Sequence, residues 1–313
     1  MPVPAPPPDA FAIAPEVRDA LAGQMPVVAL ESAVISHGLP SPVGIETAAA
    51  LEAEVRRGGA VPATVAVVDG RIVVGALGPT LRRLVAGDAM KIAERDLAVA
   101  VATGATGGTT VSATIAAAAA CGIAVMSTGG IGGVHLGAER TWDISADLPA
   151  LTRHSVLVVC AGTKAICDIP KTLEYLDTAG VPVLAYGTDA FPYFYARDSG
   201  TFAPHRVDTP AAAAAVLAAR RSLAQPGGVL VAQPIPARDA LPAPTVDAAV
   251  AEALRRTQGV RGAALTPALL SALAEITTGR TLSANLALLR ANAMLAAAIA
   301  QALHRKGFVP AGT

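Results

Sequence analysis

Six short, continuously apolar runs recur along this chain of 313 residues, and a helix-like stretch follows each of them. The runs are residues 26–32, 64–70, 123–130, 155–162, 182–188 and 228–236. A run without alternating polar residues predicts a strand that is covered by protein on both faces of its sheet. Strands that alternate with helices in this way form three-layer folds. We therefore predict an α/β protein, α/β/α in layers, with a mostly parallel sheet.

Two segments modify this simple pattern. Residues 68–77 carry an Asp-Gly pair between β-branched runs, which predicts a tight hairpin and makes the sheet mixed. From Thr245 onward the sequence is rich in helix formers, so we expect a helical C-terminal section. Ser283 is a suitable N-cap for the last helix of that section.

The chain shows no internal repeat and no long linker, so we predict one catalytic α/β domain over residues 15–308. Residues 1–14 are rich in proline and lack the basic start and apolar core of a signal peptide, which predicts a flexible tail. Residues 309–313 are expected to form a second short tail.

The composition of the chain argues against nucleic acid and membrane as binding partners. The 24 basic and 24 acidic residues balance, and only 3% of residues are aromatic, so neither an electrostatic nor a stacking surface for nucleic acid is expected. The most apolar region, 113–125, is too short to span a membrane. The three cysteines form no CxxC pair, which indicates a reducing, cytoplasmic compartment. A small-molecule substrate fits these features best.

Two reactive side chains follow predicted strands. Glu31 comes directly after the first apolar run, and Lys164 follows the run that ends at residue 162. Ligands of open α/β sheets bind outside the carboxyl ends of the strands, so these two groups could face one pocket as an acid and a nucleophile. Apolar surroundings favour the uncharged, nucleophilic form of a lysine amine, as Schiff-base chemistry requires. The alternative is that both side chains are simply solvated.

Asp143, Ser145 and Asp147 alternate along the chain, and in an extended segment such side chains point the same way. Their oxygens suit a hard divalent cation such as Mg²⁺ or Mn²⁺. The alternative is the start of a helix, with Asp143 or Ser145 as its N-cap.

Two glycine-rich runs, 104–114 and 127–139, bring backbone amides within reach of an anion, and the first leads into an alanine-rich helix. The same glycines could instead serve close packing. Lys91 and His135 could add positive charge there, although a surface lysine and a structural histidine are the simpler interpretations.

These residues lie within long motifs, including VALESAVISHGLP, GATGGTTVSAT, STGGIGGVHLGAERTWDISADL and VVCAGTKAICDIPKTLEYLDTAGVPV. In their order and content, and nearly from end to end, they resemble the pseudouridine-5'-phosphate glycosidases. The resemblance implies reversible cleavage of the C–C glycosidic bond of pseudouridine 5'-phosphate to ribose 5-phosphate and uracil. It implies a metal-dependent lyase of the hydro-lyase class.

The resemblance also implies roles for individual residues. Lys164 matches the nucleophile that holds a ring-opened ribose, Glu31 the acid/base, and Asp143 the ligand of one Mn²⁺ per subunit, for which Mg²⁺ or another divalent ion is the alternative. The positions that match substrate contacts are Lys91, Val111, Thr128, His135, Ser145, Ala146, Asp147 and Asn285. Members of the family are homotrimers, which implies the same assembly here.

Two positions depart from the family pattern. Ala33 stands where threonine commonly follows Glu-Ser, and Gln233 stands where asparagine commonly precedes Pro-Ile-Pro. Two alternatives therefore stay open beside the glycosidase: a related Schiff-base enzyme that acts on another sugar phosphate, and a catalytically idle sugar-phosphate binding protein.

Overall fold

The structure is a computed structural model, and it describes residues 9–85, 89–260 and 265–305. Within these ranges eleven strands form one sheet in the order β1-β4-β3-β2-β7-β8-β11-β9-β10, and β6 joins β5 to β3. The strands are β1 (Phe11–Ile13), β2 (Val27–Leu30), β3 (Val61–Val68), β4 (Arg71–Val74), β5 (Met90–Ile92), β6 (Gly107–Thr109), β7 (Val125–Ser127), β8 (Leu157–Cys160), β9 (Val183–Tyr186), β10 (His205–Val207) and β11 (Val229–Ala232).

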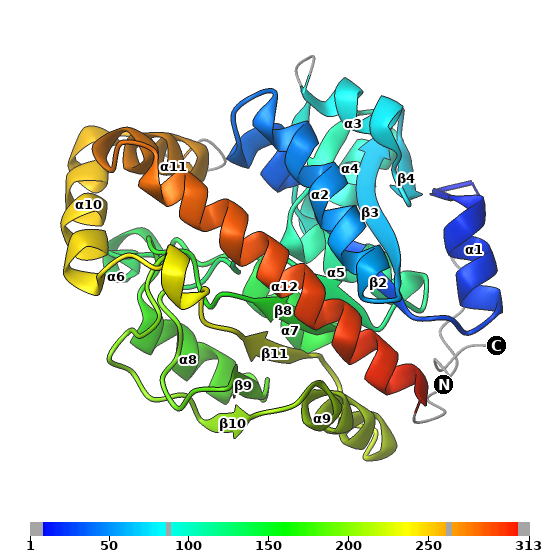
Figure 1. The fold of residues 1–313 in the computed structure, drawn as a ribbon. Coiled ribbons are helices and arrows are strands. Elements are labelled where there is room, and N and C mark those ends of the chain that lie inside the picture. The colour runs from blue at the N-terminus through cyan, green and yellow to red at the C-terminus, as the bar shows by residue number, and fades with distance from the viewer. Residues whose placement is uncertain (1–8, 86–88, 261–264, 306–313) are drawn as a thin grey trace.

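The six apolar runs coincide with β2, β3, β7, β8, β9 and β11. These strands are neighbours in the sheet, and every pair among them is parallel. Almost all of their residues are buried, because helices cover both faces of this central part (Figure 1). The predicted three-layer architecture with a mostly parallel sheet is therefore confirmed.

Antiparallel pairing of β3 with β4 makes the sheet mixed, as predicted from the Asp-Gly pair. Asp69 and Gly70 both have positive φ, 48° and 75°, which the two central residues of a type I′ hairpin turn require. The structure corrects the tail assigned to residues 1–14, because Phe11–Ile13 form β1 and pair with the free edge of β4. Residues 1–8 and 309–313 lie outside the described residues, and the single domain over 15–308 stays a prediction.

The helices are α1 (Pro15–Ala22), α2 (Val43–Arg57), α3 (Gly78–Val85), α4 (Leu97–Ala102), α5 (Val111–Ala120), α6 (Ala138–Thr141), α7 (Asp147–Arg153), α8 (Ile169–Thr178), α9 (Pro210–Ser222), α10 (Ala243–Arg256), α11 (Leu265–Ile276) and α12 (Arg280–Arg305), with the short helices η1 (Val34–Gly38), η2 (Glu94–Asp96) and η3 (Ala237–Asp239). One core lies between the sheet and α2, α9 and α12 (Figure 1). A second core, on the other face, contains α1, α5, α7 and α8.

The long helix α12 crosses the central strands and packs against β2, β7 and β8 (Figure 1). It begins at Arg280, so the prediction of Ser283 as its N-cap is wrong. Ahead of this start, the Thr277 hydroxyl accepts a hydrogen bond from the Thr281 N–H at 3.2 Å. Among the described helices, α12 alone is long and apolar enough to cross a bilayer by length and composition, yet 56% of its most apolar window is buried inside the protein.

We expect the buried face of α12 to carry much of the stability. Ile299 is fully buried there, whereas Met294 on the same helix is 51% exposed. Replacement Ile299→Ala should lower the free energy of unfolding by about 2–5 kcal/mol, because it leaves a cavity, and Met294→Ala should change it by less than about 0.5 kcal/mol. Urea denaturation measures both. Equal losses would show that α12 is not packed as described.

Candidate active site

Three neighbouring parallel strands end beside the candidate site. Glu31 follows β2, Thr128 follows β7, and Lys164 lies in the loop after β8. Parallel neighbours end at the same edge of a sheet, which brings these three residues together. Glu31 and Lys164 line one cavity, as expected from their places in the sequence.

The cavity that holds Glu31, which we call the inner chamber, has a largely apolar wall that includes Val34, Phe194 and Leu270. Asn285 supplies a polar group from α12. A second cavity, the outer chamber, is lined by Arg95, His135, Asp143 and Ser145. Lys91, Thr110 and Lys164 line both chambers, so the lysines lie where an apolar and a polar compartment meet.

Glu31 is almost entirely buried, and the Thr128 hydroxyl donates a hydrogen bond to its Oε1. Burial raises the pKa of the Glu31 carboxyl, and the charge of Lys164 and the Thr128 hydrogen bond offset only part of that rise. Such a carboxyl keeps its proton at a higher pH than an exposed one, which suits a proton donor.

Lys91 reaches the cleft from β5, where it lies opposite Gly108 of β6. Burial and the neighbouring charge of Lys164 lower the pKa of the Lys91 amine, while Glu31 acts in the opposite direction. Gly108 is required here because a Cβ atom would lie 2.3 Å from the Ser36 hydroxyl. The first glycine-rich run therefore serves close packing, one of its two possible roles.

His37 lines both the inner chamber and a neighbouring hollow, and sequence reasoning missed it. Its Nε2 lies 3.0 Å from the carbonyl of Ala89, next to β5, and its Nδ1 lies 2.7 Å from Ser36 Oγ. Burial lowers its pKa, so it stays neutral more readily than a free histidine. Its position six residues after Glu31 was a usable signal, but the π-helix η1 that turns it into the cleft was not predictable from periodicity.

The loop that carries Lys164 is held by backbone hydrogen bonds to the turn after β7. Thr128 N–H donates to Val159 O at 3.0 Å, and Ile131 N–H donates to Gly162 O at 3.1 Å. Lys164 N–H in turn donates to Ile131 O at 2.9 Å. These bonds extend the pairing of β7 and β8 beyond both strands and fix the backbone of the candidate nucleophile.

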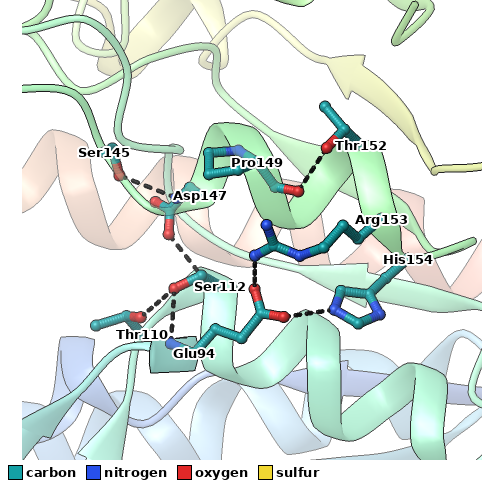
Figure 2. A network of polar contacts seen from close by, with 9 residues as sticks. All are labelled: Glu94, Thr110, Ser112, Ser145, Asp147, Pro149, Thr152, Arg153 and His154. Carbon is teal, nitrogen blue, oxygen red and sulfur yellow. Dashed lines mark hydrogen bonds and ion pairs between the residues drawn. The ribbon is translucent and has the colours of Figure 1, made fainter. Parts of the chain in front are cut away.

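Asp147, the first residue of α7, joins the two glycine-rich runs. Its Oδ1 accepts from the Ser112 N–H at 2.9 Å (Figure 2). Its Oδ2 accepts from the Gly132 N–H at 2.8 Å. These are two of the amides that the sequence suggested for an external anion. At both positions the chain's own carboxylate takes the place expected for that anion.

A second carboxylate strengthens the same region. The Glu94 N–H donates to Ser112 Oγ at 3.2 Å, and the Glu94 carboxylate contacts Arg153 at 2.5 Å and His154 at 2.7 Å (Figure 2). Burial raises the pKa of Glu94, but the hydrogen bonds from Arg153 and His154 outweigh it, so the net pKa is lowered. Both ends of α7 are thus tied to the start of α5.

The oxygens of residues 143, 145 and 147 do not form the shared array that an extended segment predicts. Ser145 Oγ accepts from the Asp147 N–H at 3.2 Å, which matches the alternative of a helix start. Asp143 is 44% exposed, and its Oδ2 lies 3.6 Å from His135 Nδ1. The described part of the chain contains no cluster of three or more His, Cys, Asp or Glu side chains able to hold a metal.

The other predicted contacts lie around the two chambers in different ways. Ala146 lines the outer chamber just before α7. Val111 begins α5 with its side chain in the core, so only its backbone is available to a substrate. Thr128 lines neither chamber and contacts Glu31 through its hydroxyl. Residues that the sequence did not single out, Thr110, Arg95 and Phe194, complete the walls.

Comparison with known proteins gives consistent matches. A family model of indigoidine synthase A-like proteins matches residues 16–302. The chain is 53% identical over 297 residues to a pseudouridine-5'-phosphate glycosidase of Solibacter usitatus, covering 93% of this chain and 99% of that protein. It is 51% identical to the enzyme of the same name from Sorangium cellulosum, covering 96% and 95% of the two chains.

Solved structures show the same likeness. The prealnumycin C-glycosynthase AlnA, in complex with ribulose 5-phosphate, superposes with a TM-score of 0.89 at 39% identity, covering 96% of this chain and 99% of AlnA. An indigoidine synthase A-like protein from Thermotoga maritima has a TM-score of 0.84 at 34% identity, covering 90% and 94%.

The raised pKa of Glu31 predicts a pH-dependent effect on stability. The folded state holds this proton more tightly than the unfolded chain, a contribution that is complete below the ordinary pKa of 4.5 and is lost as the pH rises through the folded-state value. The neutral variant Glu31→Gln should therefore have a higher Tm than the wild type at about pH 8, and the gain should shrink towards about pH 4. The exposed Glu174→Gln is the control; a gain independent of pH would contradict the assignment.

The two aspartates flanking Ser145 should differ sharply in their effect on stability. Asp147→Ala leaves two buried amides without an acceptor and should cost about 2–4 kcal/mol of unfolding free energy. Asp143→Ala, at a half-exposed side chain, should cost less than about 0.5 kcal/mol. Chemical denaturation compares them, and equal costs would refute the structural role of Asp147.

Proposed function

Because the chain belongs to the indigoidine synthase A-like family, we propose that it cleaves the C–C glycosidic bond of pseudouridine 5'-phosphate to give ribose 5-phosphate and uracil. The observation that carries the proposal is the placement of a buried carboxyl, Glu31, and an amine, Lys164, on the walls of one cavity. The relatives that bear this name match nearly the whole chain at about half identity.

The proposed reaction starts with the amine of Lys164. It attacks C1' of the ribose and a C–N bond forms. The C1'–O4' bond breaks, the proton that the amine loses passes to O4', and a ring-opened sugar stays bound to the lysine. The nitrogen lone pair then forms a C=N bond as the bond between C1' and uracil C5 breaks. Glu31 gives its proton to C5, so uracil leaves as a neutral base.

Water completes the reaction by hydrolysing the imine on Lys164, which frees ribose 5-phosphate and regenerates the amine. The sum consumes one water, and the reverse direction releases it, as in the hydro-lyase class. The raised pKa of Glu31 supports this scheme because the carboxyl must be protonated when the C–C bond breaks.

The two chambers suggest where each part of the substrate lies. The sugar phosphate suits the outer chamber, where Lys91, His135 and Ser145 offer charge and hydrogen bonds. Uracil suits the inner chamber beside Glu31 and Asn285. The AlnA complex with ribulose 5-phosphate supports a pentose phosphate ligand for this fold.

We extend the proposal to a divalent cation, Mn²⁺ or Mg²⁺, held by Asp143 in the outer chamber. The half-exposed carboxylate of Asp143 suits an ion that keeps most of its water. When bound, the ion would supply positive charge that offsets the charge of a phosphorylated sugar. We also propose a homotrimeric assembly and a cytoplasmic location, on the resemblance and on the unpaired cysteines.

Removal of the proposed nucleophile tests this function. Lys164→Ala should lower kcat for uracil release by at least about 1,000-fold while the protein stays folded, because its amine is a reactant. Lys171→Ala, at an exposed lysine of α8, should leave kcat within about twofold. Borohydride reduction with ribose 5-phosphate, followed by peptide mass spectrometry, should place the adduct on Lys164 in the wild type and in Lys171→Ala.

The outcomes also separate the alternatives. A lysine adduct without uracil release would indicate a Schiff-base enzyme for a different sugar phosphate. Binding of ribose 5-phosphate with neither adduct nor uracil would indicate an idle binding protein.

A further inference from the structure

Asn292 lies near the middle of α12 and is almost completely buried. Its side-chain amide donates hydrogen bonds to two successive backbone carbonyls, Thr128 O at 2.8 Å and Gly129 O at 3.3 Å. Only the NH₂ group can face two carbonyl oxygens, so this orientation of the amide is well defined. The helix that crosses the sheet is thus hydrogen-bonded to the turn that follows β7.

That turn is the junction between the two reactive groups. On one side, the Thr128 hydroxyl donates to the Glu31 carboxylate. On the other, Gly129 O accepts from the Ala161 N–H at 2.8 Å, and Ile131 O accepts from the Lys164 N–H at 2.9 Å. A shift of residues 128–131 would therefore move both the proton donor and the nucleophile.

A purely structural explanation of Asn292 is weak. Its Oδ1 is buried and finds no hydrogen-bonding partner among the described residues, so the side chain carries a desolvation cost. Most neighbours on this face of α12, such as Leu288, Leu289 and Ala296, are apolar. An apolar residue would fill the position without that cost, whereas the amide adds a fixed hold on the turn.

We propose that Asn292 is a positioning residue of the reaction, which acts through the Thr128–Gly129 turn to hold Glu31 and Lys164 in register with each other. The inference rests on the proposed function and assigns to it a residue that touches neither substrate nor reacting atoms. Asn292 acts on the backbone carbonyls of the turn that carries Thr128.

The charge environment of Glu31 gives a specific readout. The groups that act on it are Lys164, Lys91 and Asp147, with His37 on the wall of the same chamber. Within this set, the hydrogen bond from Thr128 lowers the pKa of Glu31 against the effect of burial. Loss of the hold on Thr128 weakens this bond, so the pKa of Glu31 should rise further.

The experiment compares Asn292→Leu and Asn292→Ala with Thr128→Val and with the double variant Asn292→Leu, Thr128→Val. Uracil release is measured as a function of pH, with Tm alongside. Both Asn292 variants should lower kcat by about tenfold or more with a smaller change in KM, and they should move the same limb of the pH profile in the same direction as Thr128→Val. The double variant should lose clearly less than the product of the two single losses, because both residues act on Glu31 through Thr128.

Ile299→Ala is the matched control, since it removes buried volume from the same helix away from the turn. It should lower Tm and leave the pH profile unchanged. Asn292 variants that behave like this control, or singles whose effects multiply in the double, would overturn the inference while the wild type still releases uracil. A wild type that releases no uracil would overturn the proposed function and this inference together.

Discussion

The hydrogen bonds that continue the β7–β8 pairing past the ends of both strands hold the candidate site together. They join residues 128–131 to residues 159–164, so the turn that carries Thr128 and the loop that carries Lys164 form one unit. Because β2 lies beside β7, Glu31 contacts the same turn from the other side, through its hydrogen bond with Thr128. Asn292 reaches this unit from α12 and ties it to the helix that covers the central strands.

Burial changes the pKa values of the ionisable groups in this unit and also lowers the stability of the fold. The apolar wall around Glu31 raises the pKa of that carboxyl, and burial lowers the pKa of the Lys91 amine nearby. A carboxyl that keeps its proton suits a reaction that needs a proton donor, and Lys91, whose amine has a lowered pKa, lies in the same cleft. The same burial lowers the stability of the folded state at neutral pH. Such a loss is common where function and stability compete.

Much of the fold was predictable because the central strands are apolar on both faces. Glu31 and Lys164 were predictable as well, since strand ends in an α/β sheet are where ligands bind. The strand β1 was missed because Phe11–Ile13 follow a proline-rich stretch, and their pairing with β4 depends on an edge formed far along the chain. Local sequence patterns do not predict pairing with an edge strand that lies far along the chain.

Asp147 and Asn292 show a second limit. In the sequence, Asp147 resembles a cation ligand, and only the fold shows that its oxygens are taken by amides from two distant loops. The sequence around Asn292 indicates a helix of the hydrophobic core. The hydrogen-bonding partners of Asn292 lie more than 160 residues earlier in the chain. Hydrogen bonds of this kind become visible only when the tertiary structure is known.

A crystal structure of the protein soaked with ribose 5-phosphate tests the central claim most directly. We expect continuous density from Lys164 Nζ to C1' of an open-chain sugar. The phosphate should lie in the outer chamber near Lys91, and the Glu31 carboxyl should face C1' from the inner chamber. A sugar phosphate bound as an intact ring away from Lys164, or joined to another lysine, would contradict it.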